Sequence, residues 1–113
     1  MKIIHKKETK LFKNSDVCDA FEYDLARADM GGVVVAVRGR HPDNGRVVNT
    51  ECNEMAYILE GKGIISIEDV KMVFAAGDVI LIEAQEKYFW DGNFSAVLFS
   101  VPAWNTGQFK IVD

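Results

Sequence analysis

The chain has 113 residues, 49% of them hydrophobic and 27% charged, with a formal net charge of −4 and a pI near 5.1. That length predicts a single domain, that composition argues against disorder, and the acidic balance leaves no basic footprint for nucleic acid. No apolar run approaches the roughly 20 residues that span a bilayer, and residues 1–15 lack the apolar stretch of an export signal. We therefore expect a cytoplasmic protein that binds neither nucleic acid nor a membrane.

The charge is unevenly distributed along the chain. Residues 1–13 carry five lysines and one glutamate, a net of +4, so the remaining hundred residues sum to −8. Lysines are typical of a solvated edge strand, because their charge discourages pairing with another chain. Contact with an acidic surface, including a partner subunit, is the alternative.

The first elements in chain order are an ambiguous stretch and a clear strand. Within residues 10–25, Ser15 and Asp16 can cap a short helical turn, whereas the aromatic residues of this stretch fit strands. Residues 31–39 are rich in valine and bounded by glycines, which predicts a strand buried on at least one face.

The rest of the chain alternates short apolar runs with turn residues. Turns are expected at residues 41–46, 61–63, 68–69, 75–78 and 91–93, most of which hold glycine, proline, asparagine or aspartate. The strands expected between them are 47–60, bent near Cys52, then 64–67 and 70–74 as a hairpin, 79–82, and a last pair, 88–90 with 94–101. About nine or ten short strands with little helix predict an all-β sandwich or small barrel.

The spacing of three residues indicates a particular fold. Six residues separate Glu54 from Gly61 in NEMAYILEGKG, and Gly77 opens the strand GDVILI sixteen positions after Gly61. Over residues 33–101 this pattern resembles the cupin family, whose two motifs read G-x5-H-x-H-x3-4-E-x6-G and G-x5-P-x-G-x2-H-x3-N. The resemblance implies an all-β, cupin-like jelly-roll β-barrel or sandwich with a ligand site inside its mouth.

The metal ligands of the cupin motifs are replaced in this chain, apart from Glu54. The paired histidines of the first motif fall at Val48 and Thr50, or at Val47 and Asn49, and the histidine of the second falls at Tyr88. Imidazole nitrogen gives such a site its affinity for zinc, nickel or iron, so we expect no bound transition metal and no cofactor. Magnesium or calcium on the oxygens of Asn49, Glu51 and Glu54 is the remaining metal hypothesis.

Strand alternation identifies the side chains expected to face the cavity. If Glu54 points inward, Ala56 and Ile58 do the same, whereas Met55, Tyr57 and Leu59 point outward. The ligand-binding residues predicted in this way are Asn49, Glu51, Glu54, Tyr88 and Trp90. The alternative for the two aromatic residues is that they only fill a barrel too small for a ligand.

Glu54 is the candidate catalytic residue, with Tyr88 as a second proton donor. Desolvation, and any nearby charge on Glu51, would raise the pKa of Glu54 toward the range of a general acid or base. The structural alternative is an ion pair of Glu54 with one of three arginines, Arg38, Arg40 or Arg46. His5 and His41 lie outside the motif positions and are expected to be exposed, although His41 could hang over the mouth.

The outward face of the barrel is expected to be apolar and to need cover. Its expected members are Met55, Tyr57, Leu59, Phe99 and Val101. A partner subunit is one cover and the N-terminal segment is another. The cupins that the chain resembles are commonly homodimers, so the resemblance implies a homodimer.

The chain is expected to form one cupin-like domain over residues 1–113, with N-terminal strands or an arm at 1–30, the barrel core at 31–101 and a tail at 102–113. The main functional hypothesis is a metal-independent binding protein for a small polar or sugar-like ligand. The alternative is an isomerase, epimerase or lyase acting on a carbohydrate or small acid, with Glu54 and Tyr88 in proton transfer and with or without an oxygen-ligated metal. A purely structural accessory subunit is a third hypothesis.

Overall fold

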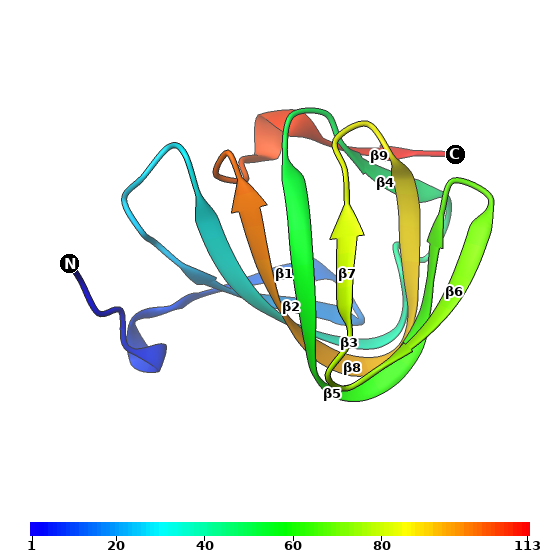
Figure 1. Ribbon diagram of the computed structural model, residues 1–113, viewed down its shortest axis with the longest axis horizontal. Coiled ribbons are helices and arrows are strands. Elements are labelled where there is room, and N and C mark those ends of the chain that lie inside the picture. The colour runs from blue at the N-terminus through cyan, green and yellow to red at the C-terminus, as the bar shows by residue number, and fades with distance from the viewer.

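The computed structural model describes all residues from Met1 to Asp113 and consists almost entirely of β-strands (Figure 1). Its nine strands are β1 (Lys10–Ser15), β2 (Cys18–Tyr23), β3 (Gly31–His41), β4 (Arg46–Asn49), β5 (Asn53–Ile67), β6 (Val70–Ala75), β7 (Val79–Ile82), β8 (Lys87–Val101) and β9 (Phe109–Val112). Two 3-10 helices, η1 (Lys6–Glu8) and η2 (Thr106–Gln108), lie near the chain ends. The expected all-β fold of about nine or ten strands is confirmed.

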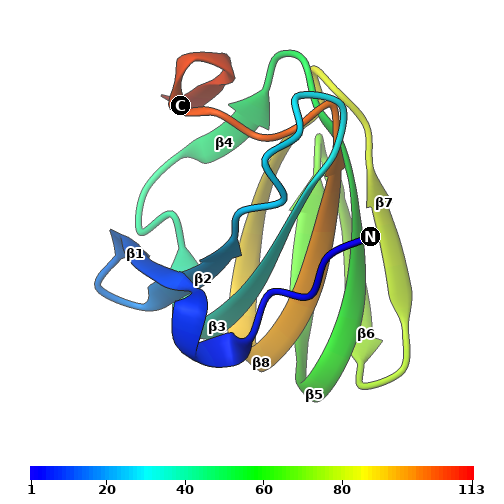
Figure 2. The same cartoon turned by 90° about the vertical axis from the view of Figure 1, so that its left-hand side faces the viewer.

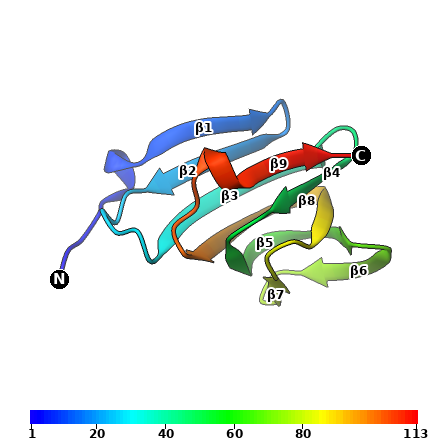
Figure 3. The ribbon, with the colours of Figure 1, turned by 90° about the horizontal axis from the view of Figure 1, so that it is seen from above.

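The nine strands form one strongly curled antiparallel sheet. Its order is β1-β2-β3-β8-β4-β9, and β5 pairs with β8, β6 and β7. Seen from above, β1 and β2 lie at one edge of the molecule and β5, β6 and β7 at the opposite edge (Figure 3), and the long strands β5 and β8 bend through a U (Figure 1). The inner face of the sheet therefore surrounds an interior, as in a jelly-roll half-barrel. Residues 102–113, expected as a tail, contribute β9, which pairs with β4.

Two expected turns are wrong, because β5 and β8 are unbroken strands of 15 residues each. Their ladder passes through residues 61–63 and 91–93, and the strands curve there together instead of reversing (Figure 2). Gly61 has a φ of +84°, and a Cβ at this position would collide with the carbonyl oxygen of Asn93. A register shift between Ile58 and Glu60 adds to the bend. Glycine at position 61 thus permits both the sharp bend of β5 and the close approach of its backbone to that of β8.

Other expectations about the strands have mixed outcomes. The hairpin of β5 and β6 and the strand β7 are confirmed. Residues 15–18 connect β1 and β2 as a hairpin, so the helical turn is wrong, and β1 is an edge strand. The single strand expected over 47–60 is two strands, β4 and β5. They are separated because the backbone of residues 50–52 leaves the sheet to bond with Gln108.

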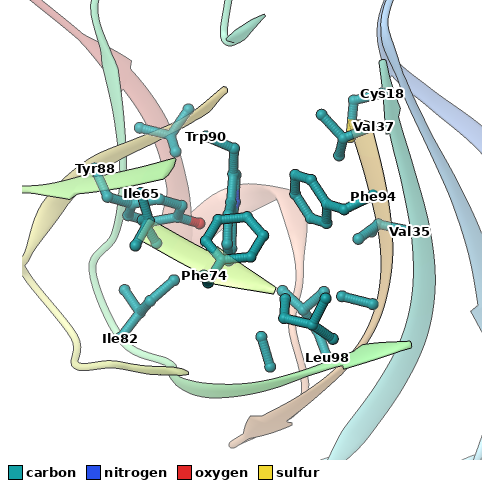
Figure 4. Close-up of a cluster of buried hydrophobic side chains, with 14 of the residues drawn as sticks. Cys18, Val35, Val37, Ile65, Phe74, Ile82, Tyr88, Trp90, Phe94 and Leu98 are labelled. Atoms are coloured by element: carbon teal, nitrogen blue, oxygen red, sulfur yellow. The ribbon is translucent and has the colours of Figure 1, made fainter. Parts of the chain in front are cut away.

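The inward side chains of the curled sheet pack into one apolar core (Figure 4). Trp90 occupies its centre, with ring centroids 5.6 Å from Phe74 and 5.2 Å from Phe94. The alternation expected for β5 is confirmed. Glu54, Ala56 and Ile58 are buried, and Met55, Tyr57 and Leu59 are each 43% exposed.

Gly61 and Gly77 provide a matched test of the close crossing. Both have positive φ, +84° and +94°, but a Cβ at Gly77 would meet nothing within 4 Å. Gly77→Ala should therefore cost only left-handed backbone strain, about 1–2 kcal/mol. Gly61→Ala adds the collision with Asn93 and should cost several kcal/mol more, or prevent folding. Urea unfolding measures both. Equal destabilisation by the two substitutions would show that the crossing imposes no constraint.

Candidate functional site

A cavity of about 220 Å³ lies inside the curl of the sheet. Most of its wall is apolar, and the strands β2 and β3 supply much of it. Three groups that can exchange protons reach this one cavity from three strands: His41 from β3, Glu54 from β5 and Tyr88 from β8. The volume is below that of drug-sized ligand pockets and suits a small molecule.

Glu54 is buried, and the protein makes hydrogen bonds to only one of its two carboxyl oxygens. Asn49 Nδ2 donates a hydrogen bond to Glu54 Oε1 over 2.6 Å, and the Tyr88 hydroxyl makes a longer contact of 3.4 Å with the same oxygen. Burial raises the pKa of Glu54 above its ordinary value, and the hydrogen bonds from Asn49 and Tyr88 oppose this rise. Both hydrogen bonds reach Oε1, and Glu54 Oε2 accepts no hydrogen bond from the protein.

His41 is a cavity residue that the sequence analysis considered only as an alternative to an exposed side chain. It is 7% exposed and lines the cavity, so the expectation of an exposed histidine is wrong. Its Nδ1 lies 3.0 Å from Ser15 Oγ, and its Nε2 has no partner in the protein. Burial lowers the pKa of His41, which favours a neutral imidazole, although the charge of Asp43 opposes this effect. The available signal was the alternation of β3, since Val35, Val37 and position 41 share one face.

Asn49 lies behind Glu54 and not in the wall of the cavity. It is 1% exposed, and its Oδ1 accepts a hydrogen bond of 2.9 Å from Gln108 Nε2. Gln108 is also 1% exposed, and the sequence carried no signal for it because it is far from Asn49 along the chain. Asn49 therefore supports Glu54, whereas the sequence reasoning assigned it to the ligand.

Tyr88 and Trp90 line the cavity and belong to the core at the same time. Each is 4% exposed, and their ring centroids are 6.2 Å apart at an interplanar angle of 85°. Burial and then the charge of Glu54 raise the pKa of Tyr88 well above 10, so its hydroxyl keeps its proton at neutral pH. Tyr88 and Trp90 can therefore pack in the core and also line the cavity.

The other partners expected for Glu54 from the sequence lie elsewhere. Glu51 is exposed and outside the cavity wall, so it does not contribute to the raised pKa of Glu54. None of the three arginines pairs with Glu54. Arg38 is 3.3 Å from Asp19, Arg40 bonds to turn carbonyls and lies over the Phe89 ring, and Arg46 bonds to the Asp113 carbonyl.

The donor groups around Glu54 do not fit the metal site of a histidine-ligated cupin. The partners of its carboxyl group are an amide and a phenol, from Asn49 and Tyr88. No group of three or more histidine, cysteine, aspartate or glutamate side chains is arranged to hold a metal ion. The oxygen set with Glu51 does not fit either, because Glu51 lies outside the cavity wall.

A curled antiparallel half-barrel with a small-molecule cavity on its inner face is the architecture of a cupin. Residues 30–97, more than half of the chain, match the EutQ-like cupin domain. The chain therefore belongs to the EutQ-like cupin family. A comparison with curated proteins finds no match.

Solved structures share the fold over nearly the whole chain. A variant of Streptomyces PAC13 with uridine superposes with a TM-score of 0.89 at 20% identity, over 99% of this chain and 90% of that one. PAC13 is described as a nucleoside dehydratase. Ectoine synthase from P. lautus superposes with a TM-score of 0.75 at 13% identity, over 100% of this chain and 91% of that one. KdgF from Halomonas sp. superposes with a TM-score of 0.71 at 13% identity, over 93% of this chain and 96% of that one. At such identities the likeness concerns the fold.

The helices of this chain are all too short to cross a membrane.

Replacing Glu54 by glutamine should stabilise the folded protein at neutral pH. Because burial raises the pKa of Glu54, the folded state binds this proton more tightly than the unfolded chain does. Stability is then lost as pH rises from the ordinary pKa through the raised one. The amide has the same size and carries no charge, so Glu54→Gln should gain about 1 kcal/mol of stability at pH 7.5 and little near pH 4.

Urea unfolding at both pH values measures this difference, and the exposed Glu51→Gln is the matched control, with no expected gain. A Glu54→Gln protein that is less stable than the wild type at pH 7.5 would contradict the buried, proton-retaining state of this carboxyl group.

Proposed function

We propose that this cupin is a metal-independent acid–base enzyme that transfers protons on a small, sugar-containing ligand. The proposal rests on one observation, the convergence of His41, Glu54 and Tyr88 on one cavity. A neutral imidazole with one unengaged nitrogen can take a proton, and a carboxyl group whose pKa is raised by burial can give one.

The lyase form of this reaction uses both groups. His41 takes the proton from a carbon next to a carbonyl, and the electron pair left behind forms a carbon–carbon double bond as the hydroxyl on the next carbon leaves. The protonated Glu54 gives its proton to that hydroxyl, which departs as water. His41 then releases its proton to solvent, and Glu54 takes up a proton from solvent, so both groups return to their starting states. Tyr88 keeps its own proton and contacts the Glu54 carboxyl group. Without a leaving hydroxyl, the same transfers isomerise or epimerise the ligand.

The likeness to PAC13 supports a nucleoside-like ligand and the lyase form. PAC13 is a nucleoside dehydratase, and its structures contain uridine. That likeness rests on a fold shared at 20% identity, so the ligand class comes to this chain as part of the proposal. The aromatic wall formed by Tyr88 and Trp90 is consistent with a planar ring beside a sugar.

Charges around the cavity favour a neutral ligand over a phosphorylated one. Besides Glu54, which is protonated in the proposed reaction, the acidic side chains that line it are Glu22 and Asp24. Its single basic side chain with a fixed charge, Arg27, already pairs with Asp29 at 2.6 Å. A phosphate group would therefore meet carboxylates without a free cation, and we expect a nucleoside to bind better than its monophosphate.

A non-catalytic binding protein is the second candidate function. The mostly apolar wall favours it, because such a surface can hold a ring without chemistry. The two candidates share the cavity and the ligand class and differ in turnover, so a kinetic test separates them.

Proton exchange in D₂O tests the enzyme proposal. Nucleosides and sugars that carry a carbonyl group are incubated with the protein, and NMR follows the loss of the adjacent C–H signal or the appearance of the elimination product. His41→Gln and Glu54→Gln should each slow the wild-type reaction by about 10²-fold or more, because each removes one acid–base group. Ligand affinity, measured by calorimetry, should change little.

Glu22→Gln is the matched control, since it neutralises a carboxylate of the cavity wall outside the proton-transfer pair, and it should retain the rate. Wild-type rates in both His41→Gln and Glu54→Gln would refute the enzyme proposal. Tight binding by a wild-type protein that exchanges no proton in any bound ligand would establish the binding-protein alternative.

We also propose that two copies of the chain associate through the outer face of β7, β5 and β8. Cross-strand neighbours form an apolar row there, Leu81, Met55 and Phe99, and each is 43–59% exposed. Tyr57, Leu59, Val79 and Val101 extend this outer face with similar exposure. An apolar patch of this kind is unusual on a monomer, which supports a partner subunit as its cover.

Leu81→Arg should convert the dimer to a monomer, because it places a charge within this apolar row. Sedimentation or light scattering measures the mass. Ile111→Arg is the control: it is 66% exposed on β9 and should leave the dimer intact. A wild-type protein that is monomeric at high concentration would refute the association.

A further inference from the structure

Gln108 is a buried side chain with every polar atom of its amide engaged. It ends η2 and is 1% exposed. Its Oε1 accepts hydrogen bonds from the backbone N–H groups of Glu51 and Cys52, each at 3.2 Å, and its Nε2 donates to Asn49 Oδ1 over 2.9 Å. The backbone carbonyl of Gln108 also accepts from the Thr50 N–H and hydroxyl groups, at 2.9 Å each.

These contacts fix the orientation of two amide groups in succession. A backbone N–H can only donate, so the end of the Gln108 amide that faces Glu51 and Cys52 must be the oxygen. The nitrogen of Gln108 then faces Asn49, and the atom of Asn49 that meets this donor must be its oxygen. The nitrogen of Asn49 is therefore turned toward Glu54 Oε1, 2.6 Å away.

We infer that Gln108 is a positioning residue for the proton transfer assigned above to Glu54. It acts through Asn49, which it locks with the donor facing Oε1, while Oε2 is left without a hydrogen bond from the protein. If Asn49 rotated, its oxygen would face Oε1 and disfavour the ionised form of Glu54, which the present donor stabilises. The inference rests on the proposed function only for its catalytic meaning, because the orientation itself is a property of the free protein.

Several titratable groups face Glu54, and none contacts the Gln108 amide through its side chain. Tyr88 on β8 contacts Oε1, Cys52 precedes β5, and His41 on β3 lines the same cavity. Cys18 and Glu22 on β2, with Asp24 after it, line the cavity from the other side. Substitution of Gln108 by an uncharged residue alters none of these side chains and adds no charge near Glu54.

A double-mutant cycle tests the inference through the pKa of Glu54, measured by ¹³C NMR of its carboxyl carbon without ligand. Gln108→Met removes the amide without adding charge, and should raise the pKa of Glu54 by about half a pH unit or more, because the donor of Asn49 is no longer held. In the Asn49→Leu background, which lacks that donor, Gln108→Met should have no further effect. The loss of the Glu51 and Cys52 hydrogen bonds lowers stability in both backgrounds and does not distinguish them.

Equal shifts of the Glu54 pKa in both backgrounds, or no shift where Asn49 is intact, would overturn the inference. If Gln108→Met does not fold, the wild type supplies the second measurement. The Asn49 side-chain amide protons should exchange slowly with solvent and show NOEs to the Tyr88 ring, and rapid exchange would overturn the inference. Neither measurement involves turnover, so a failure here is distinct from a failure of the proposed enzyme. An active enzyme should also lose kcat more than affinity in Gln108→Met.

Discussion

The curl of the β5–β8 ladder is the constraint on which the rest of the structure depends. Glu54 lies opposite Ser100 at one end of this ladder, and Tyr88 lies opposite Ile67 at the other. A straight strand would carry the 13 steps from residue 54 to residue 67 over about 43 Å. The Tyr88 hydroxyl nevertheless lies 3.4 Å from Glu54 Oε1. Only a sheet that bends back on itself closes this distance, and glycine at the crossing permits the bend.

Closure of the sheet also determines the chemistry of the site. A carboxyl group at the surface would keep its ordinary pKa, but the curl places Glu54 among aromatic side chains, and desolvation raises its pKa. The same enclosure lowers the pKa of His41. Burial thus moves the pKa values of a carboxyl group and an imidazole toward each other, and a hydrogen bond from the Asn49 amide limits the shift of the carboxyl group.

The long strands β5 and β8 show why some sequence predictions were right and others wrong. Alternation along β5 identified Glu54, Ala56 and Ile58 as inward, because residues two apart point to the same face wherever the strand runs. Glycine was correctly recognised as a point of special geometry, but Gly61 bends a continuous strand instead of ending it. A glycine with positive φ is compatible with both outcomes, and only the neighbouring backbone of β8 selects between them.

Local pattern was therefore enough to predict the all-β fold and the inward face of β5, and the resemblance to the cupin motifs added Glu54 and Tyr88 as candidate residues. The tertiary structure alone decided that His41 joins them, that Glu51 does not, and that Gln108 from the other end of the chain orients the amide beside Glu54. The physical reason is that spacing along a strand reports direction, whereas proximity between residues 41, 54, 88 and 108 depends on how far the whole sheet curls and on which loop its last strand packs against.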